Sequence, residues 1–408
     1  SAAICCLVAK AFNELYGLHI STRGIMQVAY RGELLTGSRC GRLDQACAYG
    51  ETPVLMHFNQ SEIDVEKLRV GKTYWVIADL WAGKDTKKIL AYLNKAYPFA
   101  TDETGIREQE ALGRDNHEII KKARKSIEEA NPEALILAEH YGDPYSWLQG
   151  DEWDTVMNYD AFMEPITWFL TGMEKHSDEA RPDKYGNPDY FFGAMHHNMA
   201  RMGGQSTAIS MNELSNHDHS RFLTRTNRTV GRTNTLGPEA ANNNINKSVF
   251  KEAVVIQMTW PGAPTVYYGD EAGVCGFTDP DNRRTYPWGQ EDKELIDFHR
   301  AVIRMHKENE VLRTGSYKSL YSAYNVIAYG RFSKDDAAII IINNNEDEVR
   351  AKIPAWEVGL GFDDDVEQLM VTFEGGYSTD RLGYHLQNGW LDIGLRKTSA
   401  VVLHKMQW

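Results

Sequence analysis

The chain has no uninterrupted run of eighteen apolar residues, so the sequence predicts no membrane-spanning helix. It also has no excess of positive charge: 44 Lys and Arg stand against 57 Asp and Glu, which gives a formal net charge of -13. Nucleic-acid binding depends on basic surfaces that neutralise phosphates, so we expect no nucleic-acid partner. The apolar start of the chain has no basic segment before it and makes a weak signal peptide.

Cysteine is scarce, and its pattern argues against a cysteine-based metal site. The chain has five cysteines, an odd number, without the paired Cys-x-x-Cys units of a zinc site. We therefore predict reduced thiols in a cytoplasmic protein. The remaining composition, 42% hydrophobic and 25% charged, is ordinary for a globular chain of two or three domains.

The first 130 residues mix helical and extended patterns. The spacing of apolar residues predicts helices over residues 2–16, 21–36, 86–97 and 114–130, and strands over residues 52–58 and 73–79. These elements predict a mixed α+β segment at the N-terminal end of the chain.

Beyond residue 132 the pattern changes to short apolar runs separated by longer, partly helical connections. The runs cover residues 134–139, 154–159, 208–215 and 263–271. Apolar strands of this length with helical crossovers are typical of a parallel sheet in an α/β fold. Four such strands amount to half of an eight-stranded barrel. From about residue 314 the alternating, strand-rich pattern predicts a separate antiparallel β domain.

Acidic residues stand where two of these runs end. Glu139 closes the run ALILAE, and His217 and Asp218 lie in ELSNHDHSRF at the end of the third run. Because barrel active sites gather at the carboxyl ends of the strands, we expect both carboxylates to lie in one cleft. Paired carboxylates suit glycoside hydrolysis, in which a carboxylic acid protonates the leaving oxygen. Taken alone, each acid fits a helix cap or a loop charge better than a catalytic role.

Several longer strings carry a family resemblance. ANPEALILAEHYGD, SNHDHSRFL, PGAPTVYYGDEAG and DPDNRRTYPW follow one another in an order that resembles family 13 glycoside hydrolases, most of all the cyclomaltodextrinase and neopullulanase group. The resemblance covers residues 122–408. It implies the C-terminal half of a TIM (β/α)8 barrel followed by a β-sandwich. It also implies hydrolysis of α-1,4 bonds, with α-1,6 bonds as a further option, in starch-derived oligosaccharides by a retaining mechanism.

The same resemblance implies roles for five residues. Glu139 matches the general acid/base, and Asp218 matches the carboxylate that stabilises the transition state. His217 matches a sugar-binding histidine, while Asp281 and Arg284 match a loop that lines the substrate cleft. No cofactor is implied for this activity, and we expect no metal site, because the family's usual calcium ligands precede the region of resemblance.

The family's nucleophile, an aspartate in a pattern like Gly-Phe-Arg-Leu-Asp, is not recognisable in the sequence. The string CGRLDQ contains Asp44, but it lies too far before Glu139 and no apolar strand leads into it. Loss of the nucleophile removes the covalent step of the retaining route. We therefore expect impaired hydrolysis.

The N-terminal strings resemble a different family. SAAICCLVAKAFNELYG, GELLTGSRCGRLDQACAYG and KTYWVIADLW are similar to GHMP-type sugar kinases of the galactokinase branch, over residues 1–122. The resemblance implies ATP and magnesium as cofactors. It makes Ser1 the last serine of a phosphate-binding loop, Glu33 a magnesium ligand and Asp44 the carboxylate facing the sugar hydroxyl. The glycines of that loop are missing from the sequence.

The sequence thus predicts a fusion of two partial enzymes in three domains, at residues 1–122, 123–314 and 315–408. Three functions stay open: an α-glucan hydrolase, an ATP-dependent sugar kinase, and a non-catalytic carbohydrate-binding protein. The expected partners are α-glucan oligosaccharides, and a homo-oligomer is one option for the assembly.

Overall fold

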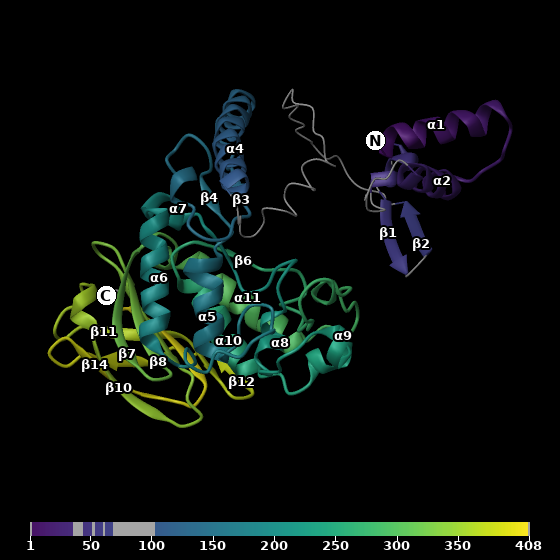
Figure 1. Cartoon of the computed structure of the whole chain (residues 1–408). Helices are drawn as coiled ribbons and strands as arrows, with labels where there is room; N and C mark the ends of the chain where they lie inside the picture. The colour runs from purple at the N-terminus through teal and green to yellow at the C-terminus, as the bar shows by residue number, and fades with distance from the viewer. Residues whose placement is uncertain (1, 36–43, 51–53, 60–61, 68–102, 407–408) are drawn as a thin grey trace. The chain divides into compact units, whose positions relative to one another are not determined.

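Figure 1 shows a computed structural model of the chain, which describes residues 2–35, 44–50, 54–59, 62–67 and 103–406. The chain divides into two compact units, Ser1–Ile119 and Ile120–Trp408. The predicted strand at 73–79 and the predicted helix at 86–97 lie outside the described residues. No described helix is both long enough and apolar enough to cross a bilayer.

Unit 1 contains two packed helices and a hairpin. Its elements are α1 (Ala2–Leu15), α2 (Thr22–Leu35), the 3-10 helix η1 (Asp44–Tyr49), and the antiparallel strands β1 (Val54–Asn59) and β2 (Glu62–Lys67). Gly17 adopts a positive φ of 59° just past α1, a backbone conformation that suits glycine and ends a helix. Both predicted helices and the first predicted strand are confirmed, whereas β2 was missed because its alternation is short and mostly charged.

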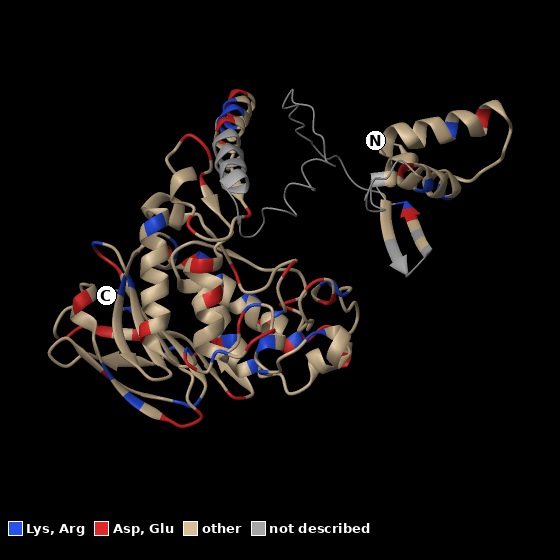
Figure 2. Cartoon of the chain, in the orientation of Figure 1, with Lys and Arg blue, Asp and Glu red and all other residues tan. Residues whose placement is uncertain are grey.

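Helix α4 (Glu103–Ala130) begins earlier than the predicted start at residue 114. Acidic and basic residues are interspersed along its described side chains (Figure 2). One of them, Arg124, donates hydrogen bonds from Nη1 to Asp154 Oδ1 at 2.9 Å and to the carbonyl of Glu152 at 3.0 Å. Asp154 Oδ2 in turn accepts from the amide of Ile136 at 2.8 Å. This link fixes the C-terminal part of α4 against the segments that lead into the first two strands of unit 2.

Four short parallel strands follow one another in unit 2. They are β3 (Leu137–Ala138), β4 (Thr155–Val156), β5 (Met211–Glu213) and β6 (Ala263–Thr265). Parallel ladders join β3 to β4 and β5 to β6, and a parallel bridge between Met157 and Met211 joins the two pairs. The spatial order therefore equals the chain order, as in one half of a barrel. All four predicted runs contain a strand, although each ladder covers only two or three residues.

Helical segments connect these strands and follow the last of them. They are η2 (Tyr145–Trp147), the π-helix η3 (Tyr159–Met163), α5 (Glu164–Thr171), α6 (Pro188–Met202), α7 (Gly204–Ala208), α8 (Phe222–Arg225), α9 (Thr233–Leu236), η4 (Pro238–Asn242), α10 (Lys247–Thr259), η5 (Asp281–Arg283), α11 (Lys293–Glu308) and α12 (Glu310–Thr314). Asn246 caps α10 by accepting bonds from the amides of Ser248 and Val249. Residues from Ser248 to Thr259 are all buried, so α10 is a central core helix.

The C-terminal part of unit 2 is antiparallel, as predicted. A seven-stranded sheet contains β7 (Ser316–Ala323), β8 (Val326–Phe332), β9 (Ala337–Asn343), β11 (Asp365–Phe373), β12 (Gly376–Ser378), β13 (Gly383–His385) and β15 (Ser399–Lys405). Its order is β12-β11-β15-β9-β8-β7, and β13 also pairs with β11. A second sheet pairs β10 (Val349–Pro354) with β14 (Trp390–Leu395), and η6 (Ala355–Val358) follows β10.

Strand β9 is buried on both faces, which explains its continuous isoleucine run. Ile339 and Ile341 pack with the apolar residues of β10 and β14. Ile340 and Ile342 belong to the main core, together with residues of α5, α10 and α11. Because successive side chains of a strand point to opposite faces, this one strand joins the small sheet to the helical layer.

The side chain of Arg331, on strand β8, links the antiparallel sheet to the ends of helices α10 and α12. Its side chain is 1% exposed. Nη1 donates to the carbonyls of Thr259 (2.7 Å) and Leu312 (2.8 Å), while Nε and Nη2 donate to that of Gly315 (3.1 and 2.7 Å). A planar guanidinium can satisfy this set of carbonyls at once, whereas an ammonium cannot.

We therefore expect Arg331→Lys to lower the free energy of unfolding by about 2 kcal/mol, because buried carbonyls lose their donors. The measurement is chemical denaturation followed by circular dichroism. Arg350→Lys is the matched control, since Arg350 is 73% exposed and pairs with Asp392 at 2.7 Å. Equal stability of the two variants would contradict the fastening role of Arg331.

Candidate active site

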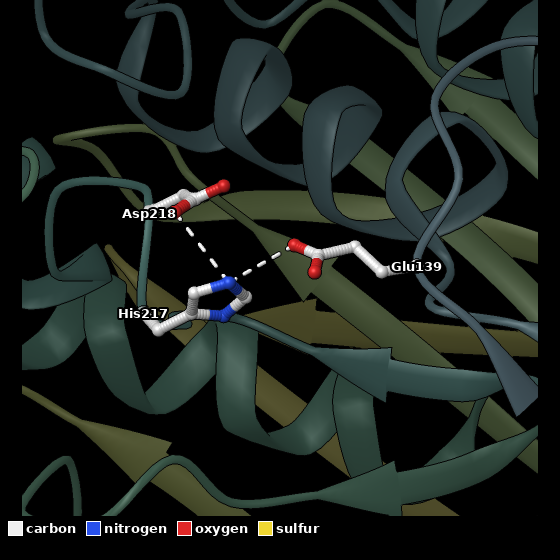
Figure 3. Close-up of side chains that lie close together, drawn as sticks. All are labelled: Glu139, His217 and Asp218. Atoms are coloured by element: carbon white, nitrogen blue, oxygen red, sulfur yellow. Dashed lines mark ion pairs between the residues drawn. The ribbon is translucent and has the colours of Figure 1, made fainter. Parts of the chain in front are cut away.

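The structure brings Glu139, His217 and Asp218 together. Glu139 directly follows β3, and the other two residues follow β5. His217 Nε2 lies 3.0 Å from Glu139 Oε1 and 3.5 Å from Asp218 Oδ1, so the imidazole stands between the two carboxylates (Figure 3). All three side chains remain accessible, with exposures of 42% for Glu139 and 37% for each of the others. The two acids thus share one solvent-accessible site.

The side chain of Asn216 shapes the turn that carries His217 and Asp218. Its Oδ1 accepts hydrogen bonds from the amides of Asp218 (3.0 Å) and His219 (2.9 Å). Its Nδ2 donates to Tyr159 Oη at 3.1 Å and to Glu213 Oε1 at 2.8 Å. Because Asn216 is 2% exposed, water does not compete for these bonds.

Two stacked tyrosines, Tyr141 and Tyr159, each donate a hydrogen bond to one of the two carboxylates. Tyr159 Oη donates to Glu139 Oε1 at 3.1 Å, and Tyr141 Oη donates to Asp218 Oδ2 at 3.3 Å. Their rings lie 4.5 Å apart at an angle of 23°. Burial raises the pKa of both phenols above its usual value, and the neighbouring carboxylates add to this effect. Both tyrosines are therefore neutral hydrogen-bond donors.

His219 lies beneath the site and is uncharged. Its side chain is fully buried, and its Nε2 lies 3.1 Å from Tyr141 Oη. Burial lowers the pKa of this imidazole to about 2, and the positive charge of Arg225 contributes to the decrease. His219 therefore supports Tyr141 without adding charge.

Glu213, the last residue of β5, is a site residue that the sequence analysis did not single out. It is 2% exposed. Burial raises its pKa to about 8, the charge of Glu139 adds to this increase, and the hydrogen bond from Asn216 opposes it. The sequence signal that could have identified it is its place at the end of an apolar run, a few residues before the Asn-His-Asp string.

The loop around η5 places its arginines differently from the sequence expectation. Arg284 pairs with Asp281 (Nη2 to Oδ2, 2.8 Å) and also donates to Asn242 Oδ1 at 3.0 Å. These bonds hold the loop together. The neighbouring Arg283 is the arginine that extends toward the carboxylates: its Nη2 lies 3.9 Å from Asp218 Oδ1, and its Nε donates to the carbonyl of His217 at 3.0 Å.

The kinase-like candidates belong to unit 1. Glu33 is buried in α2 and accepts a hydrogen bond from Gln45 Nε2 at 2.9 Å. Asp44 begins η1, but its side chain is outside the described part of the chain, and so is Ser1. The kinase-like roles of these three residues therefore stay predictions.

One group of side chains has the spacing to hold a cation. The ligand atoms of Glu139, His217 and Asp218 lie within 4.8 Å of one another. Carboxylate oxygens with one imidazole nitrogen are ligands that several divalent metals accept. The same three groups can also form hydrogen bonds with sugar hydroxyls. The expected absence of a metal stays a prediction.

Carboxylates that follow the ends of parallel strands, together with a C-terminal antiparallel domain, are the arrangement of an alpha-amylase-type fold. The chain belongs to the alpha-amylase family: the model of the alpha amylase catalytic domain matches residues 85–363. This match begins before residue 122, the predicted start of the resemblance. The model of the GHMP kinase N-terminal domain matches residues 1–51, so the chain has a two-part architecture.

The similar proteins include amylopullulanases and cyclomaltodextrinases. An amylopullulanase from Thermoanaerobacterium saccharolyticum is 33% identical over 283 residues, which is 64% of this chain and 21% of that protein. A cyclomaltodextrinase from a Bacillus species is 30% identical over 261 residues, 62% of this chain and 42% of that protein. The chain thus spans less than half the length of these curated relatives.

Solved structures show the same fold. A cyclomaltodextrinase structure has a TM-score of 0.56 at 25% identity and covers 71% of this chain and 43% of that one. A debranching enzyme from Nostoc punctiforme has a TM-score of 0.54 at 24% identity over 70% of this chain and 54% of that one. The predicted alpha-amylase-type fold with a C-terminal antiparallel domain is therefore confirmed.

The raised pKa of Glu213 predicts a dependence of stability on pH. The folded chain keeps a proton that the unfolded chain releases above pH 4.5, so stability falls as pH rises from 4.5 to about 8 and is then constant. In Glu213→Gln the neutral side chain removes this loss. Its stability relative to the parent should rise by up to about 1.4 kcal/mol per pH unit within that window.

Chemical denaturation at several pH values measures this difference. Glu374→Gln is the control, since Glu374 is 70% exposed and should give a difference that does not change with pH. A Glu213→Gln difference that is flat between pH 5 and 8 would show that Glu213 is already ionised in the folded chain.

Proposed function

We propose that the chain carries part of a retaining α-glucan hydrolase site, with Glu139 as general acid/base and Asp218 as the carboxylate that stabilises the transition state. The observation that supports this most is the convergence of Glu139 and Asp218, from two different parallel strands, on one imidazole. Family membership and relatives named amylopullulanase, cyclomaltodextrinase and neopullulanase support the substrate class. No cofactor enters the proposed reaction.

Each group has a defined task in this proposal. Glu139, held by Tyr159, gives a proton to the leaving glycosidic oxygen and takes one back from water. Asp218, held by Tyr141 and the turn at Asn216, accepts hydrogen bonds from sugar hydroxyls as positive charge develops on the ring. His217 Nε2 lies within reach of both carboxylates and acts as a further sugar contact.

The retaining route also needs a nucleophilic carboxylate. Within residues 103–406 the group of converging ligand atoms contains two carboxylates, Glu139 and Asp218. Glu213 is buried, hydrogen-bonded to Asn216 and protonated below a pKa of about 8, which makes it a poor nucleophile. We therefore propose that the 408-residue chain binds α-glucans but hydrolyses them poorly.

The expected result is slow or undetectable release of reducing ends from maltodextrin and pullulan, with retained binding of maltoheptaose by calorimetry. Asp218→Asn should weaken that binding about tenfold, because a charged acceptor of hydrogen bonds is lost. Asp297→Asn is the control, since Asp297 is 63% exposed and lies outside the site. Robust turnover that vanishes in Glu139→Gln would contradict the impairment. Absence of both binding and turnover would contradict the α-glucan site itself.

A second candidate function is ATP-dependent phosphorylation of a sugar, because the GHMP kinase model matches residues 1–51. The phosphate cradle of such enzymes positions the nucleotide, and catalysis depends on that positioning. Calorimetry with ATP and magnesium tests this candidate, and absence of nucleotide binding would remove it. Phosphorylation of galactose that is lost in Asp44→Asn would support it.

A further inference from the structure

Two aromatic side chains of the antiparallel domain stay exposed beside one hairpin turn. Trp356 of η6 is 48% exposed, and Phe362, in the loop between η6 and β11, is 68% exposed. A Cβ atom added to Gly389 would lie 2.9 Å from Trp356 Cβ and 3.0 Å from Phe362 Cδ1. Both side chains therefore border the same glycine, which leaves room for them because it has no side chain of its own.

Backbone hydrogen bonds hold the two aromatic residues in place around this glycine. The amide of Trp356 donates to the carbonyl of Gly389 at 3.1 Å, and the amide of Gly389 donates to the carbonyl of Phe362 at 2.8 Å. Asn388 and Gly389 have positive φ values of 53° and 79° and form the two-residue loop of a hairpin that leads into β14. The two side chains thus start from one fixed framework.

The surrounding chain is anchored in the core, so the exposure of the two aromatic residues belongs to the folded domain. Asp364 Oδ2 accepts a hydrogen bond from the amide of Gly361 at 2.7 Å, which closes the loop on either side of Phe362. Three nearby residues of η6 and this loop are buried in the core between the two sheets: Ala355, Val358 and Leu360. A surface that is already fixed before binding loses little conformational entropy when a ligand arrives.

The polar groups around the two rings favour a neutral, hydroxyl-rich ligand. Gln387, Asn388 and Asp363 are exposed, and together they offer both donors and acceptors of hydrogen bonds. The carboxylate of Asp363 and the net charge of -13 disfavour a polyanion or an anionic lipid surface. A stable protein interface buries about 1,200 Å² or more, which is far beyond what two side chains supply. A sugar presents C–H groups to an aromatic face and hydroxyls to the polar groups beside it.

We propose that Trp356 and Phe362, with the side-chain amides of Gln387 and Asn388, form a second binding site for α-glucan chains. This aromatic patch is separate from the carboxylate site: β10 and β14, which flank it, lie away from β3, the strand before Glu139 (Figure 1). The choice of an α-glucan as the ligand rests on the proposed function, whereas the preference for a neutral sugar rests on the patch itself. The aromatic patch would retain the protein on a polymeric substrate.

The test is retention of the full chain on granular starch. Trp356→Ala and Phe362→Ala should each raise the apparent dissociation constant about tenfold, because a ring that stacks on the sugar is lost. Trp356→Leu should have the same effect, since it keeps an apolar side chain but removes the flat ring. Tyr324→Ala is the matched control, because Tyr324 is a 61% exposed aromatic residue in the turn between β7 and β8. Circular dichroism should be unchanged in all four variants.

Retention that is absent in the parent chain, or unchanged in the variants of Trp356 and Phe362, would overturn the inference. Retention that Trp356→Leu preserves would overturn the stacking on which it depends.

Asp218→Asn separates this inference from the hydrolase proposal. Retention that depends on Asp218 and is indifferent to Trp356 would support the carboxylate site and overturn the aromatic patch. Retention that depends on Trp356, with binding of maltoheptaose that is indifferent to Asp218, would support the aromatic patch and contradict the proposed role of the carboxylates.

Discussion

The site depends on one buried side chain, that of Asn216. Its Oδ1 holds the amides of Asp218 and His219, and its Nδ2 reaches Tyr159, which in turn donates to Glu139. The two carboxylates come from strands that are far apart in the sequence, yet this amide sets the position of both. Asn216 and Tyr159 are buried, so the two acids meet solvent while these two supports do not.

The rest of unit 2 provides a rigid base for that network. Helix α10 is buried along nearly its whole length, and the isoleucines of β9 join two cores through one strand. Arg331 satisfies three carbonyls, one at the end of α10 and two at the end of α12. By contrast the parallel strands themselves are short, with two or three residues each.

The sequence predicted the four parallel runs and the antiparallel domain because periodicity reports burial directly. It also predicted that Glu139 and Asp218 share a cleft, since strand ends gather at one face. It could not tell which of Arg283 and Arg284 lies near Asp218, because the directions of neighbouring side chains in a loop depend on the backbone conformation. Glu213 was missed for a similar reason: its raised pKa comes from burial by distant segments. The strand β2 and the early start of α4 were missed where charged residues obscure the pattern.

The central proposal is that Glu139 and Asp218 act on one bound sugar. The most direct measurement is a crystal structure of the chain with bound maltotetraose. The account predicts a glucose unit in contact with His217, with its glycosidic oxygen toward Glu139 and its hydroxyls toward Asp218. An ordered sugar bound elsewhere on the chain, with none at these three residues, would contradict the account.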